Sequence, residues 1–150
     1  MDLCVFNRLP ATFTVSFTSD SSGSPVTGTL GSPIVPPGDW YCGYNNTNWL
    51  YGKPNGYSVY ALIQNLPTDR VSVNGHNNSE QLWLDGTIPS KDNPGPGCFI
   101  WLNQPDEGSS AVTDSGSVGL TLRRENDEPN WKKFYVFVEL SQGRGGCHND

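Results

Sequence analysis

The sequence predicts an all-β protein: a single-domain antiparallel β-sandwich, jelly-roll-like, with about eight to ten short strands. Residues that disfavour helix are abundant, since 17 Gly and 12 Pro stand against 3 Ala and 1 Met. Short stretches that alternate apolar and polar residues recur between turn residues, as is typical of strands with one buried face. The chain of 150 residues is expected to form one domain, 1–150, whose core needs no cysteines.

The clearest strand is predicted at 12–18, where Phe13, Val15 and Phe17 point to one face and hydroxyl side chains point to the other. Residues 118–124 alternate in the same way. Further strands are expected at 26–30, 40–44, 57–63, 71–73, 82–84, 98–102 and 134–140. The predicted core consists of Phe13, Val15, Phe17, Val59, Trp101, Leu120, Leu122, Val136 and Val138.

Turn residues indicate where the strands connect. The dipeptides Asn74-Gly75 and Asp85-Gly86 are typical of hairpin turns, because Asn, Asp and Gly accept the positive φ that such turns need. This interpretation places His76 in a solvated turn. Loops are expected at 45–56 and 104–116, and a Gly-rich tail is expected at 141–150.

Charge and hydropathy argue against nucleic-acid binding and against a membrane-spanning segment. The formal net charge of −6 argues against nucleic-acid binding, because a diffuse negative charge repels phosphates. The sequence contains no run of about 18 apolar residues, so no transmembrane segment is expected. The N-terminal residues lack the basic and apolar regions of a secretory signal. The chain is therefore expected to stay inside the cell, with a vacuole or an inclusion-type body left open, or to leave the cell by an unconventional route.

Four cysteines lie far apart in the sequence: Cys4, Cys42, Cys98 and Cys147. The absence of a Cys-x-x-Cys motif argues against a redox site or a zinc knuckle. Each cysteine is a candidate for a structural or an intermolecular disulfide, and the sequence does not choose between the intramolecular pairings. Cys4 and Cys147 lie near the two chain ends, where they can pair with each other or with a neighbouring molecule.

Residues 40–60 hold most of the tyrosines and two tryptophans, interleaved with Asn and Gly. Exposed rings beside amide groups favour a contact surface for a glycan, a lipid headgroup or another protein. The alternative is that these rings pack over the end of the sandwich. The predicted contact surface consists of Tyr44, Asn45, Asn46, Asn48, Trp49 and Tyr51.

The sequence offers no evident set of catalytic residues. His76 and His148 fall in an expected turn and in the tail, which does not favour a triad or a zinc site. Asp106 and Glu107 are adjacent in an expected polar loop, and the sequence has no Asp-x-Asp-x-Asp-Gly calcium motif. We expect a protein that is not an enzyme and that binds no cofactor or metal.

The favoured function is self-association: a structural protein that forms disulfide-supported homo-oligomers or a dense, crystalline assembly. A sequence pI near 4.7 adds to this prediction, because mild acidity brings the net charge toward zero and reduces repulsion between copies. A lectin-like module is the first alternative, with Trp49 or Tyr51 stacking on a sugar while neighbouring asparagines bind its hydroxyls. A membrane-active β-sandwich that inserts exposed aromatic side chains is the second.

Overall fold

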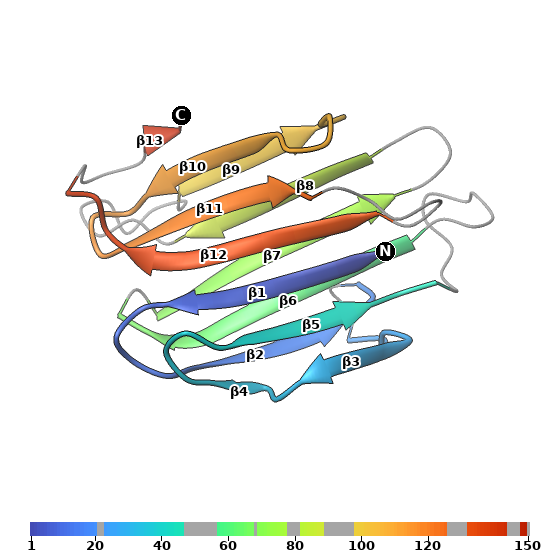
Figure 1. Cartoon of the computed structure of the whole chain (residues 1–150), viewed down its shortest axis with the longest axis horizontal. Helices are drawn as coiled ribbons and strands as arrows, with labels where there is room; N and C mark the ends of the chain where they lie inside the picture. Colours follow the sequence, from blue (N-terminus) through green and yellow to red (C-terminus); the bar gives the residue numbers. More distant parts are fainter. Residues whose placement is uncertain are drawn as a thin grey trace.

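The computed structural model folds as two β-sheets packed face to face (Figure 1). It describes residues 1–20, 23–46, 57–67, 69–77, 82–88, 98–125, 132–143 and 148–149. Within these ranges the regular secondary structure consists of strands alone. The strands are β1 (Asp2–Arg8), β2 (Phe13–Thr18), β3 (Gly28–Gly31), β4 (Ile34–Val35), β5 (Trp40–Tyr44), β6 (Tyr57–Leu66), β7 (Asp69–Asn77), β8 (Leu82–Ile88), β9 (Cys98–Asn103), β10 (Ser110–Asp114), β11 (Val118–Arg124), β12 (Lys133–Leu140) and β13 (His148–Asn149).

One sheet has seven strands in the order β13-β10-β11-β12-β1-β5-β3, and the other has six in the order β4-β2-β6-β7-β8-β9. Neighbouring strands run antiparallel except β1 and β12, which are parallel. This parallel pair joins the first strand of the chain to a strand near its end. The predicted all-β sandwich is therefore confirmed, with one parallel pair inside a mostly antiparallel architecture.

Most of the described strands form where the sequence predicts them, and four lie outside that prediction: β1, β4, β10 and β13. β1 was not predicted, and β10 lies inside the expected loop 104–116. Both strands bury polar residues: Asn7 on β1 and Thr113 and Asp114 on β10 are each at most 1% exposed. Buried polar side chains need hydrogen-bond partners, and Asp114 accepts one at 2.8 Å from the Ser141 hydroxyl.

The core lies between the two sheets and is built from the inward-facing residues of each strand. Of the predicted core, Phe17 is only partly buried and packs against the core from its margin. Trp101 was assigned to the core wrongly, because it is 52% exposed on β9 while its neighbours Ile100 and Leu102 point inward. The remaining predicted core residues are buried: Phe13, Val15, Val59, Leu120, Leu122, Val136 and Val138.

The two predicted Gly-containing turns are strand interiors instead. Gly75 lies within β7 and Gly86 within β8, and both face the core. A Cβ added to Gly75 would lie 2.4 Å from Cε of Met1, and one added to Gly86 would lie 2.8 Å from Cδ2 of Leu120. Glycine at these positions therefore provides room for the opposite sheet rather than a reversal of the chain.

The expected Gly-rich tail is also partly strand, because β13 pairs with the end of β10. His148 thus belongs to a sheet edge, where it lies opposite Asp114 in the register. A search of the described residues found no helix of the length and hydropathy needed to cross a bilayer.

Candidate functional site

The outer face of the six-stranded sheet carries aromatic and polar side chains over β7, β8 and β9. β8 alternates strictly, so that Leu84 and Gly86 face the core while Trp83 and Asp85 face outward. Cross-strand pairing places outward residues of the adjacent strands beside them, with Asn74 and Trp101 on either side of Asp85. We call this surface the aromatic-polar face, and it comprises Asn74, His76, Trp83, Asp85, Phe99 and Trp101.

The aromatic rings of this face form a corner rather than a flat platform. The ring centroids of Trp83 and Trp101 lie 6.5 Å apart with their planes at 89°. Phe99 lies 6.5 Å from Trp101 on the same strand, at an angle of 57°. Trp101 and Phe99 are 52% and 49% exposed, so their ring surfaces are open to a ligand. Large apolar rings that remain in water mark contact sites more often than isolated aliphatic side chains do.

Asp85 supplies the negative charge of the aromatic-polar face. Its carboxylate accepts one hydrogen bond, from the side-chain amide of Asn74 at 3.2 Å. Partial burial raises the pKa of Asp85, and the hydrogen bond from Asn74 opposes that rise. Both ion pairs found among the described residues lie elsewhere, at Arg8 and Arg123, so this carboxylate has no cationic partner within the described part of the chain.

The structure places His76 on strand β7, where its ring packs against Trp83. The prediction that His76 is a solvated turn residue is therefore wrong. It lies on β7 opposite Trp83, and the centroids of the two rings are 3.6 Å apart. Burial lowers the pKa of His76 to about 4, so its imidazole is neutral at neutral pH. Tyr60, which lies opposite Asn74 in the register, donates from its hydroxyl to the hydroxyl of Ser72 at 3.2 Å, and this bond extends the polar part of the surface onto β6.

The sequence did not predict this face, because Asn74-Gly75 and Asp85-Gly86 are dipeptides typical of turns. Asn74 and Asp85 each precede a glycine, and both were interpreted as turn residues. The signal that identifies them is the period-two pattern of β8, which continues through Asp85 to Ile88 without a break. An Asp-Gly pair inside such a pattern is compatible with a strand whose glycine faces a tightly packed core.

The contact surface predicted from the sequence is only partly described by the structure. Asn45 is fully buried, and its amide nitrogen donates to the carbonyl of Ser58 at 2.8 Å, so it has a structural role in place of the predicted contact. Asn46 is exposed beside Thr27, and Tyr44 is half-buried at the end of β5. The other predicted contacts lie outside the described residues: Asn48, Trp49 and Tyr51.

Cys4 and Cys42 form a disulfide within the chain. The two residues lie directly opposite each other on β1 and β5, and they are 38 residues apart in the sequence. Cys4 is therefore not available to Cys147 or to a neighbouring molecule, contrary to the pairing suggested by its place near the chain end. Cys147 and the side chain of Cys98 lie outside the described residues.

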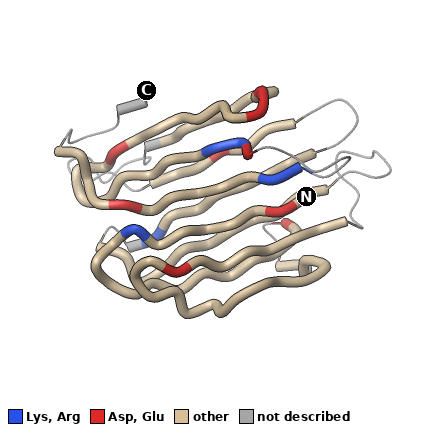
Figure 2. Tube along the Cα trace, in the orientation of Figure 1, with Lys and Arg blue, Asp and Glu red and all other residues tan. Residues whose placement is uncertain are grey.

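The outer face of the seven-stranded sheet carries a second group of apolar side chains. Phe6 on β1 contacts two rings of β12, with centroids 4.8 Å away for Tyr135 and 5.0 Å away for Phe137. The same face leaves Leu30 and Trp40 exposed, at 60% and 42%. We call these five residues the outer aromatic patch. Figure 2 shows residues of both charge signs on the strands of this sheet, mainly toward the strand ends.

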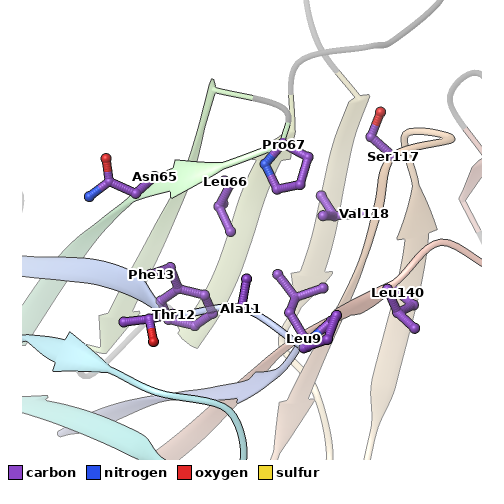
Figure 3. Close-up of a pocket in the computed structure, with 11 residues that line it drawn as sticks. Leu9, Ala11, Thr12, Phe13, Asn65, Leu66, Pro67, Ser117, Val118 and Leu140 are labelled. Atoms are coloured by element: carbon purple, nitrogen blue, oxygen red, sulfur yellow. The ribbon is translucent and has the colours of Figure 1, made fainter.

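A small cavity opens at the end of the sandwich, between the β1-β2 and β6-β7 connections (Figure 3). Its volume is about 100 Å³, and apolar residues such as Leu9, Leu66 and Val118 line it. Sites for small molecules usually measure about 300 to 1,000 Å³, so this cavity is too small for a sugar ring with its hydroxyl groups. The aromatic-polar face is the better candidate for ligand binding.

Within the described ranges, no three side chains from His, Cys, Asp and Glu are grouped so as to hold a metal ion. The aromatic-polar face is instead suited to recognition, since it combines exposed rings, an amide and a carboxylate on a rigid sheet. Comparison with protein-family models, curated proteins and solved structures found no match to this chain.

Proposed function

We propose that the protein is a carbohydrate-binding module without catalytic activity, and that its ligand lies on the aromatic-polar face. The observation that carries this proposal is the position of exposed Trp101 and Phe99 beside the hydrogen-bonded pair of Asn74 and Asp85. This arrangement supports the lectin-like alternative, but it moves the site from the expected loop to an open sheet face.

The chemistry of a sugar matches the two kinds of side chain on this face. A pyranose ring has apolar C–H surfaces, which pack against Trp or Phe rings, and an edge of hydroxyl groups, which need directional partners. Tryptophan provides a large contact area with few rotatable bonds, so little conformational entropy is lost when it is covered. The Asn74 amide and the Asp85 carboxylate then fix the orientation of the hydroxyl groups.

The position of these residues on strands also favours binding. Cross-strand neighbours are held by the hydrogen bonds of β7, β8 and β9, so the site is largely formed before the ligand arrives. A rigid site avoids the entropy cost of ordering a loop around a flexible oligosaccharide.

The experiment that tests this proposal is a glycan array followed by titration of tryptophan fluorescence with the oligosaccharides that bind. Trp101→Ala is expected to abolish binding, because it removes the most exposed ring of the face. Trp40→Ala is the matched control, since Trp40 is 42% exposed on the opposite sheet and should bind as the natural protein does. A folded protein that binds no glycan, or equal losses in the two variants, would contradict the proposal.

Self-association is a second candidate function, and the outer aromatic patch favours it. Charged residues of both signs surround the patch, since Arg8, Arg123 and Lys133 lie among Asp2, Asp39, Glu125 and Glu139. The whole chain carries a net charge of −6, so this is a face on which two copies meet with less repulsion than elsewhere. Aromatic side chains at the centre of a contact contribute most of its binding energy.

Light scattering coupled to size-exclusion chromatography, over a series of protein concentrations, tests the second candidate. Trp40→Glu is expected to shift the protein toward monomer, because it adds a charge to the patch. Ile34→Glu is the control, since Ile34 is also an exposed apolar residue, at 61%, and lies on the edge of the other sheet. A monomer at every concentration, or a response to both substitutions, would refute association through this patch.

A further inference from the structure

The carboxylate of Asp85 lies at the centre of the aromatic-polar face. Along β8 it lies between Trp83 and Thr87, which share its outward face. Across the sheet it pairs with Asn74 on β7 and with Trp101 on β9. Side chains directly opposite on antiparallel strands have Cβ atoms about 4.5 to 5.5 Å apart, so a group bound to Asp85 also meets the indole of Trp101.

No positive charge of the described residues faces this carboxylate. Arg70 is the cationic residue on the outer face of β7, and it lies four positions before Asn74, or about 13 Å along the strand. His76 is uncharged at neutral pH, and the outward side chains of β6 and β9 beside Asp85 are Tyr60 and Trp101. The negative charge of the site is therefore uncompensated within the described structure.

We propose that Asp85 provides the counter-charge for an ammonium group on the ligand, so that the aromatic-polar face binds oligosaccharides of an unacetylated amino sugar. This inference rests on the proposed carbohydrate-binding function and names the class of sugar. The bond to a protonated amine is a charge-assisted hydrogen bond, which is stronger than one between neutral groups.

The tryptophans of the site favour the same ligand. An ammonium group near the face of an indole is attracted by the negative potential of the ring, and Trp is the strongest partner for such an interaction. A carboxylate flanked by two indoles thus stabilises a cation from several sides. Acidic sugars are disfavoured, because Asp85 and the net charge of −6 both repel them. A metal ion is a poorer occupant, since a lone carboxylate supplies too few oxygen ligands.

The test compares glucosamine oligosaccharides with N-acetylglucosamine oligosaccharides of the same length, at mildly acidic pH, by isothermal titration calorimetry. The natural protein is expected to bind the free amine at least roughly tenfold more tightly, because only this ligand forms the charged pair. Asp85→Asn should remove that preference while its amide oxygen still accepts the hydrogen bond from Asn74. Asp106→Asn is the control, since it removes the same charge from an exposed loop away from the face.

The possible results distinguish failure of the amino-sugar inference from failure of the proposed carbohydrate-binding function. Equal affinity for the two sugars, with binding lost in Trp101→Ala and unchanged in Asp85→Asn, would overturn the inference and leave the carbohydrate-binding function standing. Absence of binding to any glycan would overturn both. Poly-lysine serves as a further probe. If it binds as tightly as the amino sugar and is weakened equally by Asp85→Asn, the site recognises positive charge alone, and the assignment of an amino sugar is wrong.

Discussion

The side-chain amide of Asn74 donates a hydrogen bond to the carboxylate of Asp85 across β7 and β8, with 3.2 Å between nitrogen and oxygen. These two residues lie directly opposite each other in the strand register, and both face outward. The bond holds the carboxylate in the middle of the aromatic-polar face. Hydrogen bonding favours the charged form of Asp85, whereas burial favours its neutral form.

Asn74→Ala is expected to raise the pKa of Asp85 further, because it removes the hydrogen bond that opposes the effect of burial. Carbon-13 NMR of the Asp85 carboxyl group over a pH series measures this shift. Ser72→Ala is the control, since Ser72 lies two residues earlier on the same face of β7 and does not bond to Asp85. An unchanged or lower pKa in Asn74→Ala would show that the amide does not stabilise the carboxylate.

The sign of the pH dependence follows from this shift. Because the pKa of Asp85 is raised in the folded state, the folded chain holds this proton more tightly than the unfolded chain does. The free energy of unfolding therefore falls as the pH rises from the ordinary pKa of an Asp side chain to the higher pKa that Asp85 has in the folded protein. Asn74→Ala should consequently lose more stability at neutral pH than at strongly acidic pH, as urea denaturation at the two pH values would show.

His76 is expected to make the protein less stable as the pH falls from about 6.5 to about 4. Its pKa is lowered from 6.5 to about 4 by burial, so protonation favours the unfolded chain in this range. A shift of this size corresponds to at most about 3 kcal/mol, and partial exposure reduces that figure. His76→Phe keeps a ring against Trp83 but does not titrate, so its urea denaturation should depend less on pH over this interval.

His148→Gln is the matched control for that experiment, because His148 is the other histidine of the chain. Comparison of the two variants separates the effect of His76 from that of a histidine elsewhere in the chain. If His76→Phe follows the natural protein, then protonation of His76 does not contribute to acid destabilisation.

Two phenylalanines of β2 should differ in their contribution to stability. Phe13 is fully buried, so Phe13→Ala is expected to lower the free energy of unfolding by about 3 to 5 kcal/mol. Phe17 is only partly buried beside Tyr41 and Gly43, so Phe17→Ala should cost less than that. Urea denaturation of the two variants under identical conditions provides the comparison. Equal losses would contradict the position of Phe17 at the margin of the core.

The Cys4–Cys42 disulfide should stabilise the single chain rather than join copies of it. Closing a loop of 38 residues restricts the unfolded chain, and the double substitution Cys4→Ala with Cys42→Ala is expected to cost about 2 to 4 kcal/mol. Peptide mapping of the unreduced protein by mass spectrometry tests the pairing itself. Recovery of Cys4 linked to Cys147, or to Cys4 of another molecule, would refute it.

This pairing restricts any covalent assembly to the remaining cysteines, Cys98 and Cys147. A variant with serine at both positions should migrate as a single chain on non-reducing gels, whatever its non-covalent association. A disulfide-linked dimer of that variant would mean that Cys4 and Cys42 can open and exchange.

The alternation of apolar and polar residues determined the all-β class and the position of strands such as β2 and β11. This signal is local, because a strand with one buried face needs an apolar side chain at every second residue. The pattern failed at β1 and β10, since Asn7, Thr113 and Asp114 are polar yet buried. Asn7 and Asp114 bond to partners outside their own strands, for example the hydroxyl of Ser141 for Asp114, whereas Thr113 Oγ1 makes no hydrogen bond within the described residues.

The sequence by itself thus established the fold class, whereas its predicted contact surface after β5 stays a prediction, because Asn48, Trp49 and Tyr51 lie outside the described residues. Only the tertiary structure brought together Asn74, Asp85 and Trp101, which lie on three strands, and only the register decided that they share one face. The physical reason lies in Gly75 and Gly86. An Asn-Gly or Asp-Gly pair favours a turn when judged alone, whereas here each glycine is fixed in a strand by side chains from the opposite sheet, which leave no room for a Cβ atom.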